Sequence, residues 1–352
     1  MMGTILAEAG YDCGYVGKWH LTVPPVNKEL HGFRTLMEIQ NNDVDMRIPD
    51  ACARFLRGRR SKPFLLVASF VNPHDICEWA RGQNMRNGRI GDPPNADQCP
   101  ALPDNFDIGP NEPEVIRKVQ EMRREKIYPT ADWTDEKWRQ YRWAYYHLVE
   151  LVDSRIQKVL DALKETGQEE DTVIIFVSDH GDGGGSHHWN QKQVLYEEPT
   201  RIPFIVAQKG VTKAGAVDSK HLVNTGLDII PTMCDFAGID PPEHMKGLSV
   251  RPLAERGKVR RWRDFLVTET EFCDPGNSFG ITGRMLRTEK YKYIVYSEGR
   301  LREQLFDMQK DPGEMNNLAL DSSHAKMLNR HRKRLAEWCK DNGDSFPYVS
   351  AS

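Results

Sequence analysis

The sequence predicts an α/β fold in which a central mixed or parallel sheet is flanked by helices. Two apolar runs of strand length, 63–71 and 172–177, contain almost no polar residues, which is typical of strands covered on both faces. Each run is followed directly by a polar loop, at 72–75 and 178–182. Because ligands of α/β sheets lie beyond the carboxyl ends of the strands, these two loops are the first candidates for a functional site.

Length and composition indicate a globular protein and exclude several kinds of partner. A chain of 352 residues with 39% hydrophobic residues can bury about three quarters of its extended surface. Lys and Arg number 48 against 51 Asp and Glu, so the net charge of −3 leaves no broad basic field for nucleic acid or anionic lipid. No apolar run approaches the roughly 20 residues that a membrane span requires, and the mean hydropathy of −0.62 agrees.

The first two thirds of the chain read as alternating helices and strands. In chain order, the pattern predicts a helix end at 4–10, a strand at 13–16, a helix at 51–57, the strand in 63–71, a helix at 143–165, strands at 172–178 and 202–207, and a helix at 227–237. Segment 81–114 is rich in Pro, Gly, Asn and Asp without periodicity, so we expect a long loop at the rim of a cleft.

The character of the chain changes near residue 246. Shorter alternating segments follow at 265–269, 291–296 and 304–306, and a helical pattern covers 322–339. We therefore expect a catalytic domain over 1–245 and a smaller α+β subdomain with a short antiparallel sheet over 246–352.

Cysteine usage and the N-terminal residues say little about the compartment. The seven cysteines are odd in number, widely spaced and never in a CxxC pair, which indicates buried thiols instead of a disulfide framework or zinc knuckle. The first residues have neither a basic region nor a long apolar region, so no secretory signal is visible and localisation stays open.

The densest polar cluster runs from Ser178 to Lys192, directly after a predicted buried strand. Adjacent Asp179 and His180 can both turn toward a metal ion at a strand end, and the glycines that follow allow close backbone approach. The alternative is a loop of solvated polar residues. Two acids, three histidines and a lysine after one strand favour the metal site.

Two further segments place chemistry-bearing residues after strands. In Gly17-Lys-Trp-His, Lys18 and His20 are two residues apart and point the same way if the segment is extended. His74 follows the strand in 63–71. Taken alone, each signal is weak, since Lys18 can be solvated and a lone histidine can be hydrogen-bonded in the core.

Four segments together resemble the sulfatase family of the alkaline phosphatase superfamily. They are 10–21, 64–74, 177–205 and 305–318, and they occur in the family's order over nearly the whole chain. The resemblance implies an alkaline phosphatase-like sandwich with a smaller C-terminal subdomain. It also implies hydrolysis of a sulfate ester, on a sulfated small molecule or a sulfated carbohydrate.

The resemblance also implies roles for individual residues. Asp179 and His180 would bind a divalent metal, calcium in the first place and manganese as the alternative. The implied sulfate-binding and catalytic groups are Lys192, Lys18, His74 and His20, with His74 contacting sulfate and protonating the leaving alkoxide. Fixed cations of this kind stabilise the charge that develops on the ester oxygens. His187 would be a further substrate-binding residue, although a hydrogen bond that braces the loop is an equal alternative.

The sequence departs from the family pattern in one respect. Members carry a pair of adjacent aspartates and a Cys/Ser-x-Pro-Ser-Arg motif whose Cys or Ser becomes formylglycine, and the 352 residues contain neither. Cys273-Asp-Pro-Gly lacks the Ser-Arg of the motif. We therefore expect an N-terminally truncated family member that binds metal weakly and is inactive alone, because two ligands replace the family's four.

Two alternatives stay open at this point. One is a phosphodiesterase or phosphonate monoester hydrolase of the same superfamily, because the Asp-His pair also occurs there. The other is a degenerate, non-catalytic protein that binds sulfated glycans. The identity of the ester depends on loops, here 81–114 and 271–280, whose composition does not specify a substrate.

Overall fold

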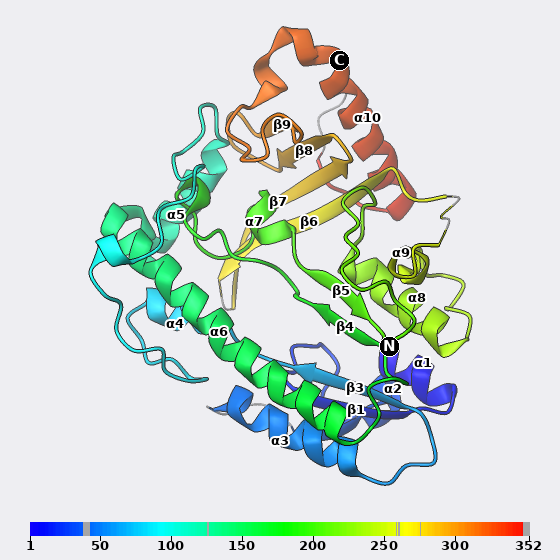
Figure 1. The fold of residues 1–352 in the computed structure, drawn as a ribbon. Helices are drawn as coiled ribbons and strands as arrows, with labels where there is room; N and C mark the ends of the chain where they lie inside the picture. Colours follow the sequence, from blue (N-terminus) through cyan, green and yellow to red (C-terminus); the bar gives the residue numbers. More distant parts are fainter. Residues whose placement is uncertain (38–42, 125–126, 258, 260, 275, 348–352) are drawn as a thin grey trace.

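The computed structural model describes residues 1–37, 43–124, 127–257, 259, 261–274 and 276–347. Three groups of strands are present (Figure 1). Strands β1 (Asp12–Gly17), β2 (Arg34–Met37) and β3 (Phe64–Ser69) form a parallel sheet in the order β2-β1-β3. Strands β4 (Ile174–Val177) and β5 (Phe204–Ala207) pair antiparallel. The C-terminal part contains the antiparallel sheet β6 (Phe265–Asp274), β7 (Asn277–Thr288), β8 (Tyr291–Tyr296) and β9 (Glu303–Asp307). The predicted α/β class with a C-terminal antiparallel sheet is confirmed.

Helices surround these sheets, and the long helix α6 runs diagonally across the molecule (Figure 1). The helices are α1 (Met2–Glu8), α2 (Lys28–His31), α3 (Val44–Arg57), α4 (Ile76–Ala80), α5 (Glu114–Arg124), α6 (Asp135–Glu165), α7 (Glu197–Thr200), α8 (Thr225–Ala237), α9 (Arg251–Ala254) and α10 (Ala325–Asn342). Within the described part of the chain, none of them combines the length and the apolar character needed to cross a bilayer.

Helix α6 begins eight residues before the predicted start at 143. The Thr134 side chain accepts a hydrogen bond from the Lys137 N–H at 3.3 Å and caps the helix. Trp138 and Tyr141 are fully buried in the first turns, within an aromatic cluster. The sequence prediction started too late because large aromatic residues mixed with charged ones hide the helical periodicity there.

The C-terminal sheet contains a strand that the sequence pattern did not predict. Strand β7 is absent from the prediction, and β6 extends past the predicted end at 269. The middle of β7 carries arginines, which break the alternation of apolar residues. Arg284 is buried nonetheless, because its guanidinium pairs with the Asp344 carboxylate at 2.8 Å.

The free edges of β3 and β4 face one cavity of about 2030 Å³. Among the described residues, β3 pairs only with β1 and β4 only with β5. All six residues of β3 are half-buried, so the expectation of a strand covered on both faces is wrong for this strand. Apolar side chains of α6 and α8, including Val152 and Ile229, line the same cavity, and Phe176 on β4 is 39% exposed.

The two expected domains share a hydrophobic core. Trp189 and Tyr196 belong to the same buried cluster as Phe272, Ile281 and Phe306 from the C-terminal sheet. The division at residue 245 stays a prediction, but the residues on its two sides pack as one body around this cluster.

Candidate active site

The carboxyl ends of β1 and β3 meet at one edge of the parallel sheet. Gly17 at the end of β1 lies in register with Ser69 at the end of β3. The Lys18 N–H donates to the Ser69 carbonyl at 2.8 Å, and the Ser69 hydroxyl donates to the Lys18 carbonyl at 3.0 Å. A Cβ at position 17 would lie 2.0 Å from the Ser69 carbonyl oxygen, so only glycine permits this approach. These two hydrogen bonds fix the backbone of Lys18 and therefore the position of its Cα and Cβ atoms.

Five residues predicted from the sequence line the cavity close to this edge. They are Lys18, His74, Asp179, His180 and Lys192, and the Asp182 carboxylate of the same loop also lines the cavity. The Lys192 Nζ lies 3.0 Å from His180 Nε2. His180 Nδ1 lies 2.7 Å from the Gly181 carbonyl oxygen, which favours the tautomer with the proton on Nδ1 and a lone pair on Nε2. The structure thus brings together five of the residues predicted from the sequence.

The electrostatics of His74 reflect this crowding of positive charge. Burial lowers the pKa of His74 to about 4, and the charges of Lys18, Lys192 and His180 act in the same direction. The imidazole is therefore neutral near pH 7. An anion between these groups would offset their charges and raise the pKa of His74, which is the direction that a proton donor requires.

The same positive charges also lower the pKa of Asp179, which favours the charged form of this acid and the neutral form of His74. Burial by itself would raise the pKa of the Asp179 carboxyl, but the positive charges of His180, Lys18 and Lys192 outweigh it and hold the pKa below its usual range. The carboxylate is ionised at neutral pH. Its Oδ2 lies 3.7 Å from His180 Nε2, and the side chain is 68% exposed toward the cavity.

Asp179 and His180 fit part of a divalent cation site. A carboxylate oxygen and an imidazole lone pair 3.7 Å apart can contact one ion. A hard cation such as calcium takes six to eight oxygen ligands. No third His, Cys, Asp or Glu ligand joins this pair among the residues that the structure describes.

His20 lies at the outer end of the segment that follows β1. It is exposed and lines the cavity. The indole N–H of Trp19 donates to the Val23 carbonyl at 2.7 Å and fixes the turn between them. His20 therefore lies at the exposed mouth of the site, and its side chain makes no hydrogen bond or ion pair with the described part of the chain.

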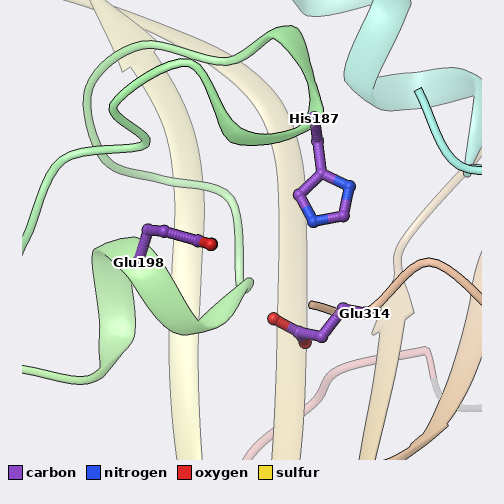
Figure 2. A group of neighbouring side chains, drawn as sticks. All are labelled: His187, Glu198 and Glu314. Atoms are coloured by element: carbon purple, nitrogen blue, oxygen red, sulfur yellow. The ribbon is translucent and has the colours of Figure 1, made fainter. Parts of the chain in front are cut away.

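His187 lies in a different place from the other predicted site residues. It is buried beside Glu198 and Glu314, with candidate ligand atoms of the three side chains within 4.8 Å of one another (Figure 2). Its ring stacks on Tyr196 at a centroid distance of 3.8 Å. His187 is not among the residues that line the cavity.

Each carboxylate of this buried cluster has at least one partner, while Glu198 Oε2 and His187 Nδ1 have no hydrogen-bond partner among the described residues. The Asn105 amide donates to Glu198 Oε1 at 2.8 Å and to the Gly313 carbonyl at 3.1 Å. The Lys292 ammonium lies 2.8 Å from Glu314 Oε1. Burial lowers the pKa of His187 to about 3, so the imidazole is neutral. His187 does not line the cavity, and its ring makes a long polar contact of 3.5 Å, from Nε2 to the Asn105 amide, so its role as a substrate-binding or loop-bracing residue stays a prediction.

The sequence analysis did not single out the residues that hold the loop between Asp179 and Lys192. The Asp182 carboxylate accepts hydrogen bonds from the Tyr141 hydroxyl at 2.9 Å, the Gly184 N–H at 2.8 Å and the Gln191 N–H at 3.0 Å. An Asp that precedes glycines is a common turn signal, so Asp182 could have been expected to close the loop. Tyr141 could not, because its contact spans 41 residues.

Strand ends, a glycine-rich loop and the side chains of Lys18, His74, His180 and Lys192 define an α/β protein with a polar cleft at the edge of its sheet. Comparison with known proteins narrows the class. The family model "Sulfatase" matches residues 1–239, and the model "N-sulphoglucosamine sulphohydrolase, C-terminal" matches residues 185–341. The chain therefore belongs to the sulfatase family, whose members are sulfuric ester hydrolases.

Individual relatives agree with this assignment. A Delta 4,5-hexuronate-2-O-sulfatase of Bacteroides thetaiotaomicron is 32% identical over 98% of this chain and 72% of its own length. An arylsulfatase of Clostridium perfringens is 33% identical over 80% of this chain. The chain spans only 54% of that arylsulfatase.

Solved structures show the same fold. A putative sulfatase of Bacteroides thetaiotaomicron superposes with a TM-score of 0.80 at 29% identity, covering 99% of this chain and 76% of that one. A phosphonate monoester hydrolase of Agrobacterium radiobacter superposes with a TM-score of 0.71 at 21% identity, covering 95% of this chain and 79% of that one. The latter likeness shows the shared fold of the alkaline phosphatase superfamily alone.

Proposed function

We propose that this chain forms the sulfate-binding and proton-transfer part of a hydrolase that cleaves sulfate esters of carbohydrates. The observation that carries the proposal is the convergence of Lys18, His74, His180 and Lys192 on one cavity at the strand ends. Together with Asp179, these side chains carry more positive than negative charge, because Asp179 is the one carboxylate among the five. An oxyanion such as sulfate balances this excess.

Each side chain then has a role in the reaction. Lys18 and Lys192 hold sulfate oxygens and stabilise the charge that grows as the S–O bond breaks. His74 donates a proton to the leaving alkoxide, and the bound anion raises its pKa for this purpose. A divalent cation at Asp179 and His180 would supply further positive charge to the same oxygens. His20, at the mouth, is placed to exchange protons with the site.

The substrate class comes from the relatives. The names of two of them specify a hexuronate 2-O-sulfate and an N-acetylglucosamine 6-O-sulfate, and both are sulfated sugars. A cavity open at the strand ends can admit a sugar ring beside the sulfate group. We therefore propose a sulfated mono- or oligosaccharide as the substrate.

We further propose that the 352-residue chain binds sulfate esters without turning them over. It contains no Cys/Ser-x-Pro-Ser-Arg sequence that could supply the nucleophile. With two metal ligands, it should also bind calcium or manganese weakly. Isothermal titration that shows tight binding of either ion at one equivalent would contradict this.

The decisive experiment measures inorganic sulfate and a sulfated disaccharide binding to the chain by titration calorimetry at low salt. We expect binding that is lost in a Lys18→Ala, Lys192→Ala double variant. Lys118→Ala is the matched control, because its ammonium pairs with Glu298 on the surface. Equal affinity in the double variant and the control would sink the proposal, and turnover of the ester by the chain would refute the inactivity.

A second candidate reaction is hydrolysis of phosphate diesters or phosphonate monoesters. The multifunctional alkaline phosphatase superfamily protein PehA of Trinickia caryophylli is 29% identical over 82% of this chain, and the Asp179-His180 pair is compatible with either reaction. Parallel titrations with an aryl sulfate and a phosphate diester of the same aryl group separate the two. Tighter binding of the diester would favour the second candidate.

A further inference from the structure

Lys192 lies between two residues with a left-handed backbone. Gln191 has φ of 65° and Gln193 has φ of 84°, and neither is glycine. Residues other than glycine rarely adopt such φ angles, and these angles persist only where surrounding contacts stabilise the backbone. The backbone on both sides of the Lys192 ammonium is therefore fixed from outside the loop.

Gln191 is held by the catalytic part of the molecule. Its N–H donates to Asp182 at 3.0 Å, and its carbonyl accepts from the Gly183 N–H at 2.8 Å. Its side-chain amide donates to Cys77 Sγ at 3.0 Å and to the Tyr128 hydroxyl. Cys77 is on α4, three residues after His74, so Gln191 joins the His74 segment to the Lys192 loop.

Gln193 is held by the C-terminal sheet. Its side-chain N–H donates to the Cys273 carbonyl on β6 at 2.9 Å, and its carbonyl accepts from the Thr270 hydroxyl at 2.8 Å. Its Oε1 accepts from the Arg123 guanidinium. Arg123 is buried and pairs with Asp274 at the end of β6, at 2.9 Å. Strand β6 of the C-terminal sheet thus holds Gln193, the residue next to Lys192, through hydrogen bonds.

We propose that Gln191 and Gln193 are positioning residues that hold the Lys192 ammonium in the anion site, so that the C-terminal sheet takes part in anion binding through Gln193. The inference rests on the proposed function in taking sulfate as the anion. Neither glutamine touches the anion itself. Each acts through Lys192, and a loss of either should matter only while Lys192 is present.

The test is a double-mutant cycle on inorganic sulfate affinity, measured by calorimetry with the whole chain. Gln193→Ala should weaken binding about five- to tenfold in the presence of Lys192, and less than about twofold in a Lys192→Ala background. Gln191→Ala should behave in the same way. Gln168→Ala is the matched control, because that half-buried glutamine also makes two side-chain hydrogen bonds and lines the same cavity, but precedes β4, whereas Asp179 follows its other end. Equal losses in both backgrounds would overturn the proposal.

A glycine variant separates backbone geometry from side-chain anchoring. Gln193→Gly adopts φ of 84° without strain but has no amide to bond with β6. We expect it to unfold at a temperature no lower than Gln193→Ala and still to bind sulfate as weakly as Gln193→Ala. Wild-type affinity in Gln193→Gly would show that the anchor is dispensable.

A readout without ligand keeps this inference distinct from the proposed function. The Lys192 charge is one of the causes that lower the pKa of His74, so Lys192→Ala should raise that pKa in an NMR titration. Gln193→Ala and Gln191→Ala should each reproduce part of this rise. If the wild-type chain binds no sulfate, the proposed function fails, while a rise in the glutamine variants still supports positioning. No rise in them, or none in Lys192→Ala, would overturn it.

Discussion

Two polar clusters both take residues from the loop and short helix between Asp179 and Glu198, and both contain histidine. The first, at the strand ends, combines Lys18, Lys192, His74 and His180 with the Asp179 carboxylate, and it lines an open cavity. The second, formed by His187, Glu198 and Glu314, is largely closed to solvent and rich in carboxylates (Figure 2).

The difference between the clusters lies in which charges are already balanced. In the buried cluster, the Lys292 ammonium contacts both Glu314 and Glu197, at 2.8 Å and 3.2 Å, and Asn105 serves Glu198. At the strand ends, Lys18, Lys192, His74 and His180 face the cavity beside the Asp179 and Asp182 carboxylates, and neither ammonium group forms an ion pair within 4.0 Å among the described residues. The same residue types therefore connect two parts of the structure in the buried cluster, whereas at the strand ends we propose that they bind a ligand. Charge balance and exposure decide between the two roles.

The strongest test of this comparison removes the cation of the buried cluster. Lys292 is fully buried between Glu314 and Glu197, so Lys292→Met leaves the buried Glu314 without a cation and Glu197 with Arg287 alone, at 3.6 Å. We expect a loss of about 3 to 5 kcal/mol in the free energy of unfolding by urea. Sulfate affinity of the folded protein should stay within about twofold of wild type. A Lys292→Met, Glu314→Gln double variant should recover part of the stability.

A matched pair of histidine variants sharpens the contrast. His187→Ala should cost about 2 to 3 kcal/mol of stability, because it removes a buried ring stacked on Tyr196, and should leave sulfate affinity unchanged. His74→Ala should cost less than about 1 kcal/mol, since this half-exposed ring is desolvated among positive charges, and should weaken sulfate binding. Urea unfolding gives the free energy of unfolding of both variants, and calorimetry gives their sulfate affinity. A reversal of the two patterns would mean that the clusters are assigned the wrong way round.

The sequence predicts one cluster well and the other poorly, for a physical reason. Lys18 and His74 follow the parallel strands β1 and β3, whose carboxyl ends meet at one edge, and Asp179 follows the apolar strand β4, so the strand patterns together with the family resemblance predict this cluster. The buried cluster of His187, Glu198 and Glu314, with Asn105 beside it, joins residues that are far apart along the chain. Their contacts depend on how a loop and the C-terminal sheet pack. Nothing local marks such contacts.

The same reasoning explains where the sequence-based prediction of the fold is right and where it is wrong. Strand β8 is predicted at its observed bounds because every position except Lys292 carries an aromatic or apolar residue. Strand β7 is missed because Arg284 is buried through its pairing with Asp344, a contact 60 residues away. Lys192 is predicted as a site residue from its motif. The hydrogen bond from the Gln193 side chain to the Cys273 carbonyl on β6 is not predicted, because the two residues are 80 positions apart.

The two histidines should also differ in how sulfate changes the pH dependence of stability. Their folded pKa values, about 4 for His74 and about 3 for His187, lie below the ordinary value of 6.5. The unfolded chain therefore binds more protons below pH 6.5, and each residue makes stability fall as the pH drops from 6.5 toward its folded pKa. His74→Gln should lessen this fall in urea titrations at pH 7 and pH 5.

Sulfate provides the control for the pH experiment. Sulfate should raise the pKa of His74 and so reduce the loss of stability between pH 7 and pH 5 in the wild type, beyond what it does in His74→Gln. Chloride at equal ionic strength should not. If sulfate acts equally on both proteins, His74 does not face the anion.

The smallest effect should come from His20, the exposed residue at the mouth. His20→Gln removes no side-chain hydrogen bond or ion pair within the described part of the chain, so stability should change by less than about 0.5 kcal/mol. Sulfate affinity should change by less than about twofold, because the ammonium groups of Lys18 and Lys192 carry the anion. A larger loss would extend the cation cluster outward to the mouth, and the boundary between the bound sulfate and the sugar would then lie farther from the strand ends.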